Sequence, residues 1–174
     1  VVLPFLSVVD QTVREYRNLL TLDRVNDIVL EAHSLAPRHY ASTEDADEDS
    51  LRMENNARDF TADTWQAPIV ITTFDQFLCA LFSSEGRYLL RFHNLADAVV
   101  VMDEIQAIPP RLWRPLSLAV QHLAVEMNAR FLVMSATQPA FLNSAEELVP
   151  NPSAVFANQQ RYRLALCWSE PQTA

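Results

Sequence analysis

"VVVMDEIQAIPP", residues 99–110, places four apolar residues directly before two adjacent carboxylates, Asp103 and Glu104. A short apolar run rich in valine is typical of a buried strand, and two charges at its end have two explanations. In the first, the strand has reached the surface and the chain has become polar. In the second, the strand end holds a metal ion and a catalytic base beneath a nucleotide.

Similar apolar runs recur along the chain and alternate with stretches of helical periodicity. This alternation is typical of βαβ units around a parallel sheet that is buried on both faces. We predict strands at 1–5, 27–32, 68–72, 98–102 and 130–134. We predict helices after Ser7, after Thr73 and over 112–127, with a weaker helical pattern over 51–64. The expected fold class is therefore α/β, with a mostly parallel β-sheet flanked by helices on both faces.

Each of the three stronger helices carries an apolar stripe at helical spacing. The stripes are Val9, Val13, Tyr16 and Leu20 in the first helix, Phe74, Phe77, Leu78, Leu81 and Phe82 in the second, and Leu112, Leu116, Val120, Leu123 and Met127 in the third. We expect these residues to pack against the sheet.

The length of 174 residues, 49% of them hydrophobic and 20% charged, fits one globular domain with a proper core. From about residue 143 the chain becomes polar and rich in proline, so we place the domain at 1–142. Residues 143–174 are expected to hold the domain end, a linker and a strand at 161–168. The apolar runs are far shorter than the ~20 residues needed to cross a bilayer, so we expect no membrane partner and a soluble, cytoplasmic protein.

The net charge is -9 and every basic side chain is arginine. This balance argues against strong, nonspecific binding of nucleic acid by this chain alone. Neither the two cysteines nor the four histidines show the spacing of a metal site, and we interpret them as core, structural or surface residues: Cys79, Cys167, His33, His39, His93 and His122.

Hydroxyl residues follow three of the predicted strands and precede the helices. Ser7, Thr73 and Ser135 each stand three residues before a side chain that completes the pattern of a helix N-cap, and Gln76 and Gln138 match the capping box. A cap needs no ligand, but a helix N-terminus is also a site for anions such as phosphate.

The carboxyl ends of parallel strands meet at one edge of a sheet, which is where such folds bind ligands. We therefore expect the acidic residues after Met102 and the hydroxyl residues after Met134 to lie side by side at that edge. The functional hypothesis for the whole chain depends on these two groups of residues being close together.

Four stretches carry a family resemblance: "LPFLSVVDQT" (3–12), "APIVITTFDQFLCALF" (67–82), "VVVMDEIQAIPPRLW" (99–113) and "FLVMSATQPAFL" (131–142). In this order they resemble the superfamily 2 helicases, and most closely the helicase part of the CRISPR-associated helicase–nuclease of type I systems. The resemblance implies a first RecA-like motor domain, from an ATP-dependent helicase or translocase on single-stranded DNA that acts in CRISPR interference, an antiviral defence.

The resemblance also implies roles for individual residues. Asp103 would bind Mg²⁺ together with ATP, and Glu104 would activate the water that attacks it. Gln106 would sense the nucleotide, and Ser135 and Thr137 would link hydrolysis to movement.

The same resemblance places a second group of residues on the single-stranded DNA track: Pro4, Ser7, Thr72 and Thr73. Contacts of this kind are made to phosphates, so they bind DNA of any sequence and provide no sequence specificity. In the family, an RNA-guided CRISPR surveillance complex recruits the motor, and base pairing reads the target.

Some motifs of the family are missing from the chain. A phosphate-binding loop needs several glycines and a lysine, whereas this chain has the single glycine Gly86 and no lysine. The family's loop precedes the first strand found here, so we expect the chain alone to bind ATP weakly and to hydrolyse little or none. The His-Asp metal motif of the family's nuclease half does not occur in the 174 residues either.

Two alternatives remain open at this point. One is another superfamily 2 motor, which acts on DNA or RNA. The other is a non-catalytic α/β domain that binds a partner, for which Asp103→Ala or Glu104→Ala would leave activity intact. A dinucleotide-binding oxidoreductase is excluded because the glycine fingerprint is missing.

Overall fold

The computed structural model describes residues 1–20, 28–34, 56–57, 59–137, 145–151, 154 and 157. The chain divides into two compact units, Val1–Leu142 and Asn143–Ala174. The sheet and the helices described below all belong to the first unit. The strand predicted at 161–168 lies outside the described residues.

Five strands form one sheet in which every neighbouring pair is parallel. They are β1 (Val2–Leu3), β2 (Val29–Ala32), β3 (Ile69–Thr73), β4 (Val99–Met102) and β5 (Arg130–Val133). The order across the sheet is β2-β3-β1-β4-β5, so the short β1 lies in the middle, between β3 and β4. All five carboxyl ends therefore meet at one edge.

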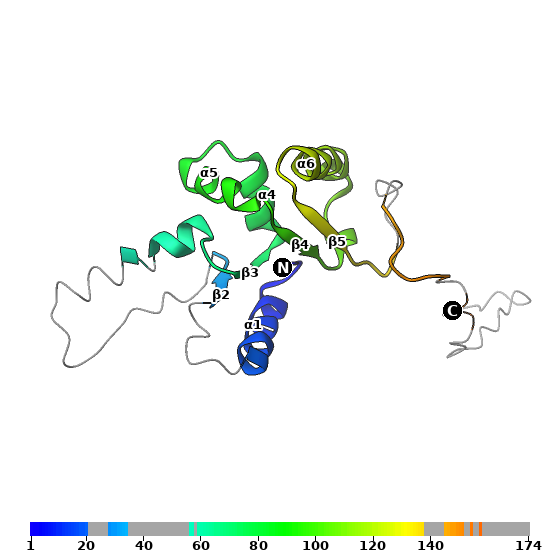
Figure 1. Ribbon diagram of the computed structural model, residues 1–174, viewed down its shortest axis with the longest axis horizontal. Coiled ribbons are helices and arrows are strands. Elements are labelled where there is room, and N and C mark those ends of the chain that lie inside the picture. Colours follow the sequence, from blue (N-terminus) through cyan, green and yellow to red (C-terminus); the bar gives the residue numbers. More distant parts are fainter. Residues whose placement is uncertain are drawn as a thin grey trace, which may run out of the picture. The chain divides into compact units, whose positions relative to one another are not determined.

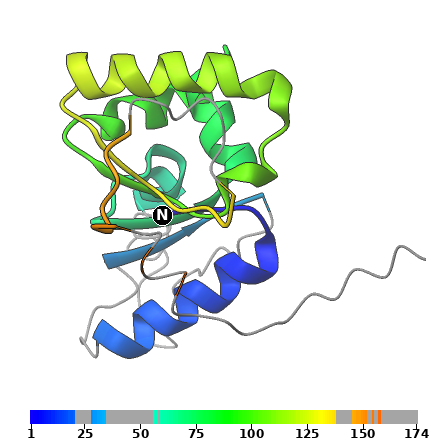
Figure 2. The same ribbon diagram turned by 90° about the vertical axis from the view of Figure 1, so that its right-hand side faces the viewer.

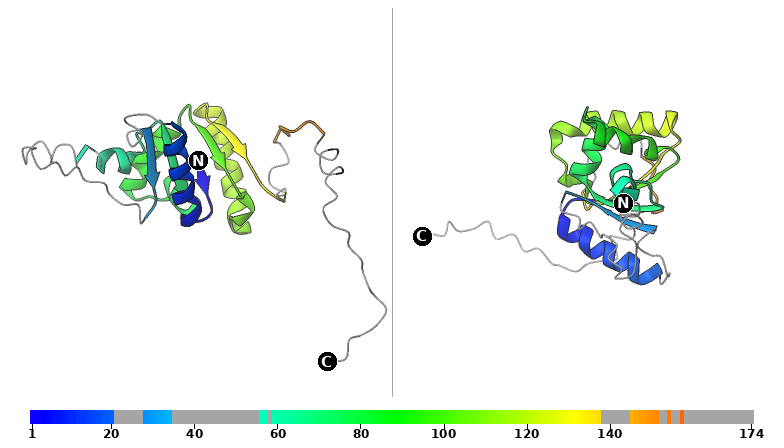
Figure 3. Two further views of the ribbon diagram at one scale, coloured as in Figure 1. Left: turned by 90° about the horizontal axis from the view of Figure 1, so that it is seen from below. Right: turned by 90° about the vertical axis from the view of Figure 1, so that its left-hand side faces the viewer.

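Helices lie on both faces of this sheet (Figures 1 and 2). Helix α1 (Leu6–Leu20) covers one face, whereas α4 (Phe74–Phe82), α5 (Gly86–Phe92) and α6 (Trp113–Glu126) lie on the other. Helix α1 packs against β1, β2 and β3. Seen from below (Figure 3, left), α1 lies in front of the sheet and does not cover β5, and Val99 on β4 is 66% exposed.

Two hydrophobic cores, one on each face, hold these layers together. The core under α1 contains Leu3, Val9, Val13, Val29 and Ile71. The core under α4 and α6 is larger and includes Phe77, Met102, Leu116 and Leu123. Strand β1 contributes to both, because side chains alternate along a strand: Val2 enters the larger core and Leu3 the smaller.

The structure confirms the predicted α/β class, with a five-stranded, all-parallel sheet and flanking helices that are consistent with a RecA-like domain. All five strands predicted in the first unit are present, as are the helices after β1, after β3 and before β5. Residues 56–57 and 59–64 are helical, in agreement with the weaker pattern. Helix α5 was not predicted, and Phe82, assigned to the apolar stripe of α4, is 47% exposed.

One predicted helix start is wrong. Helix α1 begins at Leu6, and the backbone N–H groups of Val8 and Val9 both donate to the carbonyl of Phe5 at 3.1 Å. Ser7 therefore lies in the first turn of α1 and is not its N-cap, because the Phe5 carbonyl already begins the helical ladder.

The prediction for the second helix start is confirmed. The hydroxyl of Thr73 caps α4 by accepting a hydrogen bond from the backbone N–H of Gln76 at 3.4 Å. No helix among the described residues is both long enough and apolar enough to cross a membrane.

Candidate active site at the carboxyl edge of the sheet

Asp103 and Glu104 lie at the carboxyl end of β4, between two buried residues. Met102 before them is 1% exposed and Ile105 after them is 0% exposed. The Asp103 backbone N–H donates to the Val2 carbonyl at 3.1 Å, which ties the tip to the central strand. The half-buried Asp103 carboxylate accepts from the backbone N–H of Glu104 at 2.9 Å. These contacts hold both acidic residues at the carboxyl edge of the sheet.

Glu104 adopts an unusual backbone conformation. Its φ of 53° and ψ of 45° lie in the left-handed region, which residues with a Cβ atom rarely occupy. Such strain costs on the order of 1–3 kcal/mol and concentrates at functional sites. Here the turn ends β4 and starts the short helix η2 (Ile105–Ala107), while the Glu104 side chain remains exposed.

The tip of β5 lies directly beside the tip of β4. The Met134 N–H donates to the Met102 carbonyl at 2.8 Å, and the Ile105 N–H donates to the Met134 carbonyl at 3.3 Å. The expectation that the two tips share one edge and touch is therefore confirmed.

Side chains extend this contact between the two tips. The Ser135 hydroxyl donates to Oε1 of Gln106 at 2.5 Å. Nε2 of Gln106 in turn donates to the Glu104 carboxylate. A hydrogen-bonded chain thus runs from Glu104 on the β4 tip through Gln106 to Ser135 on the β5 tip.

Ser135 has a second hydrogen-bond partner, Thr137, so its hydroxyl group has two alternative arrangements. Its hydroxyl lies 2.5 Å from the Thr137 carbonyl oxygen and accepts from the Thr137 N–H at 3.3 Å. A hydroxyl carries a single proton, so it donates either to Gln106 or to the Thr137 carbonyl at one time. The Ser135 hydroxyl therefore connects Gln106 to the backbone of Thr137.

A second feature of the same edge is a hollow of about 400 Å³ beside the ends of β1 and β3. It is lined by Pro4, Phe5, Leu6, Ser7, Ser34, Thr73, Asp75 and Gln76. Three of the four residues predicted to contact DNA, Pro4, Ser7 and Thr73, thus come together here. In the strand order, β1 lies between β3 and β4, so one strand separates the β3 side of the hollow from the strand that carries the acidic tip.

Thr72, the fourth predicted DNA contact, is placed differently. It is only 2% exposed, and its hydroxyl donates to the Ala32 carbonyl at 2.5 Å. The side chain therefore joins β3 to β2 inside the sheet, while the neighbouring Thr73 faces the hollow.

Arg91 is a residue that the sequence reasoning missed. It is 9% exposed, donates from Nη1 to Oε1 of Gln76 at 2.7 Å, and donates from Nε to the Asp63 carbonyl at 3.1 Å. Its guanidinium also lies over the rings of Trp65 and Tyr88. Burial lowers the pKa of Arg91, and the nearby charge of Asp63 opposes that shift. Arg91 thus holds Gln76 at the wall of the hollow, and because the two residues are 15 positions apart, no local pattern in the sequence signals this contact.

The structure also gathers three ligand-type side chains that were not predicted to meet: Asp10, Glu31 and His33. His33 was interpreted as a structural or surface residue, and its side chain is 5% exposed. Glu31 and His33 stand two residues apart at the end of β2, and this spacing places side chains on one face of an extended chain. That spacing was a usable signal, whereas nothing local points to Asp10 on α1.

The chain has a relative among known proteins. No family model matches the chain. The chain is similar to the CRISPR-associated nuclease/helicase Cas3 of Haloferax volcanii, with 30% identity over 148 residues. The similarity covers 83% of this chain but only 16% of the relative, so the chain corresponds to a small part of that protein's length.

Proposed function

We propose that this chain, a distant homologue of the Cas3 nuclease/helicase, forms the core of the first RecA-like motor domain of an ATP-driven helicase or translocase on single-stranded DNA. The relative's name describes a CRISPR-associated nuclease and helicase, so we place the activity in CRISPR interference. The observation that carries the proposal is the hydrogen-bonded chain from Glu104 through Gln106 to Ser135. It joins an acidic strand tip to the neighbouring hydroxyl tip.

The residues at the β4 tip fit a magnesium-assisted hydrolysis. Asp103 offers a half-buried carboxylate that a backbone N–H already orients, and Mg²⁺ takes oxygen ligands of this kind. When bound, Mg²⁺ would neutralise charge on the phosphates of ATP. Glu104, adjacent and exposed, would accept the proton of the attacking water, a role that requires a carboxylate within hydrogen-bond reach.

The remaining groups at this tip would report the state of the nucleotide. Gln106 contacts both the proposed base and Ser135. A change in the charge or position of Glu104 would alter the Gln106 amide, and the Ser135 proton would then favour the Thr137 carbonyl. The segment after β5 would receive this signal.

The hollow beside β1 and β3 would hold the DNA backbone. Its hydroxyl groups, Ser7 and Thr73, suit hydrogen bonds to phosphate oxygens, which carry no sequence information. We infer that the strand passes over this edge and that an RNA-guided CRISPR surveillance complex recruits the whole protein. Thr72 would support the track through its bond to β2 rather than through direct contact.

The phosphate-binding loop needed for full ATPase activity does not occur in the 174 residues, which contain one glycine and no lysine. We therefore propose that domain 1–142 needs further residues to bind the triphosphate, and that 143–174 leads toward the second motor domain. The isolated chain is expected to show ATPase activity near background, and activity well above background would contradict this part of the proposal.

The test of the proposal is DNA-stimulated ATP hydrolysis by the full-length protein. Glu104→Gln keeps the size of the side chain but removes its basicity, and it is expected to lower the rate by ~10²–10⁴-fold, the usual worth of a general base. The matched control is Glu126→Gln, an exposed glutamate at the end of α6, near the opposite edge of the sheet. Its rate should match wild type.

Two outcomes would redirect the assignment. Full activity of Glu104→Gln would favour a non-catalytic interaction domain. Stimulation by single-stranded RNA but not by DNA would favour another superfamily 2 motor.

A further inference from the structure

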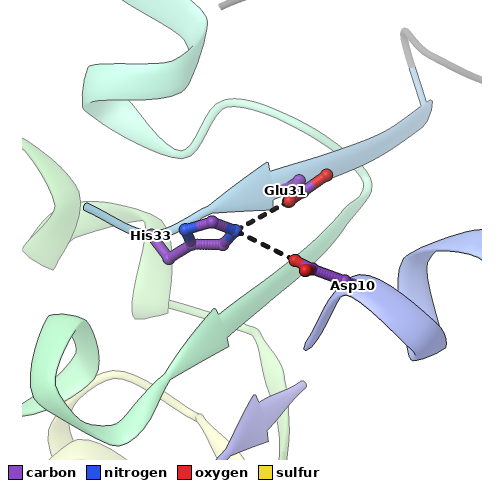
Figure 4. A group of neighbouring side chains, drawn as sticks. All are labelled: Asp10, Glu31 and His33. Atoms are coloured by element: carbon purple, nitrogen blue, oxygen red, sulfur yellow. Dashed lines mark hydrogen bonds and ion pairs between the residues drawn. The ribbon is translucent and has the colours of Figure 1, made fainter. Parts of the chain in front are cut away.

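A cluster of three side chains lies outside the proposed hydrolytic site, between α1 and the end of β2 (Figure 4). Asp10 comes from the second turn of α1, Glu31 from β2, and His33 follows that strand directly. Nε2 of His33 lies 2.7 Å from Oε1 of Glu31 and 3.4 Å from Oδ1 of Asp10. Figure 4 shows this nitrogen pointing between the two carboxylates.

In this cluster, one imidazole nitrogen lies between two carboxylates. The His33 and Glu31 side chains are 5% and 13% exposed, so water screens them poorly. A single ring N–H donates well to one oxygen at a time, and the 3.4 Å contact with Asp10 is long for a hydrogen bond. A divalent cation bound among the three side chains would balance the charge of both carboxylates.

The geometry is compatible with such an ion. One ligand atom from each of the three residues lies within 4.8 Å of the other two. Two atoms bound to tetrahedral Zn²⁺ at about 2.0–2.2 Å are roughly 3.3–3.5 Å apart. The His33–Asp10 separation of 3.4 Å already has this value, and the His33–Glu31 pair needs to open from 2.7 Å by roughly 0.6 Å.

We propose that Asp10, Glu31 and His33 form a binding site for a divalent transition metal, with Zn²⁺ as the best match. An imidazole combined with carboxylates suits Zn²⁺ better than Mg²⁺, which takes oxygen ligands. The Asp10 side chain is 53% exposed, which leaves the ion a way in and room for water as a fourth ligand. The proposal does not depend on the helicase assignment.

The ion would brace the wall of the hollow described above. It would tie α1, whose first turn contains Ser7, to the end of β2, where His33 is followed by Ser34. Since both serines line the hollow, the metal would fix the distance between two of its walls. Its role would be to position these walls, and no catalytic step needs it.

The test is titration of the metal-free 174-residue chain with ZnCl₂ by calorimetry. We expect one tight site per wild-type chain and at least a tenfold loss of affinity in both His33→Gln and Asp10→Asn. Asp10→Asn is the safer variant because this exposed side chain can change without disturbing the core, and circular dichroism checks that it folds. His122→Gln, an exposed histidine on α6, is the matched control and should bind like wild type.

A second readout is the melting temperature. At a free Zn²⁺ concentration of 100 times Kd, wild type should melt ~5–10 °C higher than without metal, and Asp10→Asn should gain little. Absence of a tight site in wild type would overturn the proposal. Wild-type affinity in both His33→Gln and Asp10→Asn would also overturn it, because other side chains would then hold the ion.

Discussion

Replacement of Arg91 by alanine is expected to lower the free energy of unfolding of the 174-residue chain by about 2–4 kcal/mol. Arg91 belongs to the short helix α5, but its contacts connect three segments on the side of the sheet that holds the larger core. It bonds Gln76 at the start of α4 and the carbonyl of Asp63, and it lies over Trp65 and Tyr88. Its removal therefore affects several contacts at once.

The magnitude follows from these contacts. Each of the two hydrogen bonds has a charged donor and is worth ~1.5–3 kcal/mol. The two rings, 5.1 and 5.2 Å from the guanidinium carbon, add ~0.5–2 kcal/mol. Burial of the charge opposes these gains by a few kcal/mol, and the lowered pKa of Arg91 has the same cause. The truncation also leaves the Gln76 and Asp63 oxygens without this donor.

Two further variants separate the contacts from the charge. Arg91→Lys keeps a positive charge but loses the planar fork that reaches both oxygens and stacks on the rings, so it should cost about half as much as alanine. Arg87→Ala is the matched control on the same helix. Arg87 is exposed and pairs with Glu85 at 2.9 Å, a surface contact worth ~0–1 kcal/mol.

Urea denaturation followed by circular dichroism measures all three variants against wild type. In a thermal scan, a loss of 3 kcal/mol corresponds to a fall of ~6–12 °C for a chain of this size. If Arg91→Ala costs no more than Arg87→Ala, the buried network contributes no net stability and the reasoning is refuted. If Arg91→Lys equals wild type, the fork geometry is irrelevant and charge alone matters.

Two other substitutions test the sheet and the larger core by the same denaturation. Thr72→Val should cost about 1–2 kcal/mol because the Ala32 carbonyl loses a buried donor; Thr72→Ser keeps the hydroxyl, and an equal loss from both would show that the bond is unimportant. Leu116→Ala, at a site with 0% exposure, should cost ~2–5 kcal/mol. Leu118→Ala on the same helix is 52% exposed and should cost less than ~0.5 kcal/mol, so similar losses would contradict the assigned core face.

The elements of the fold were predictable because they depend on local patterns. Runs such as residues 99–102 are short, apolar and mostly β-branched, which indicates a strand. The apolar stripe of α6 repeats at helical spacing, which indicates a helix, so each segment predicts its own secondary structure. The edge that holds the site also followed, since parallel strands present all their carboxyl ends together. The proximity of the acidic tip after Met102 and the hydroxyl tip after Met134 could therefore be expected from sequence alone, whereas the bond between Gln106 and Ser135 was seen only in the structure.

Local patterns were weaker guides at the strand tips. Ser7 has the sequence context of a cap, yet the Phe5 carbonyl starts the helix earlier. Thr72 and Thr73 look alike in the sequence, but the alternation along β3 sends one hydroxyl to β2 and leaves the other at the hollow. A shift of one residue changes which face a side chain occupies, and only the register with neighbouring strands decides it.

The sequence by itself determined the class of fold, the acidic tip and the hydroxyl tip, because short segments encode each of them. Only the tertiary structure decided that β1 enters between β3 and β4, that Arg91 reaches Gln76, and that Asp10 joins Glu31 and His33. These contacts join segments whose approach depends on the packing of two cores and on chain closure between them. The free energy of the whole assembly selects such contacts, and no single segment carries their pattern.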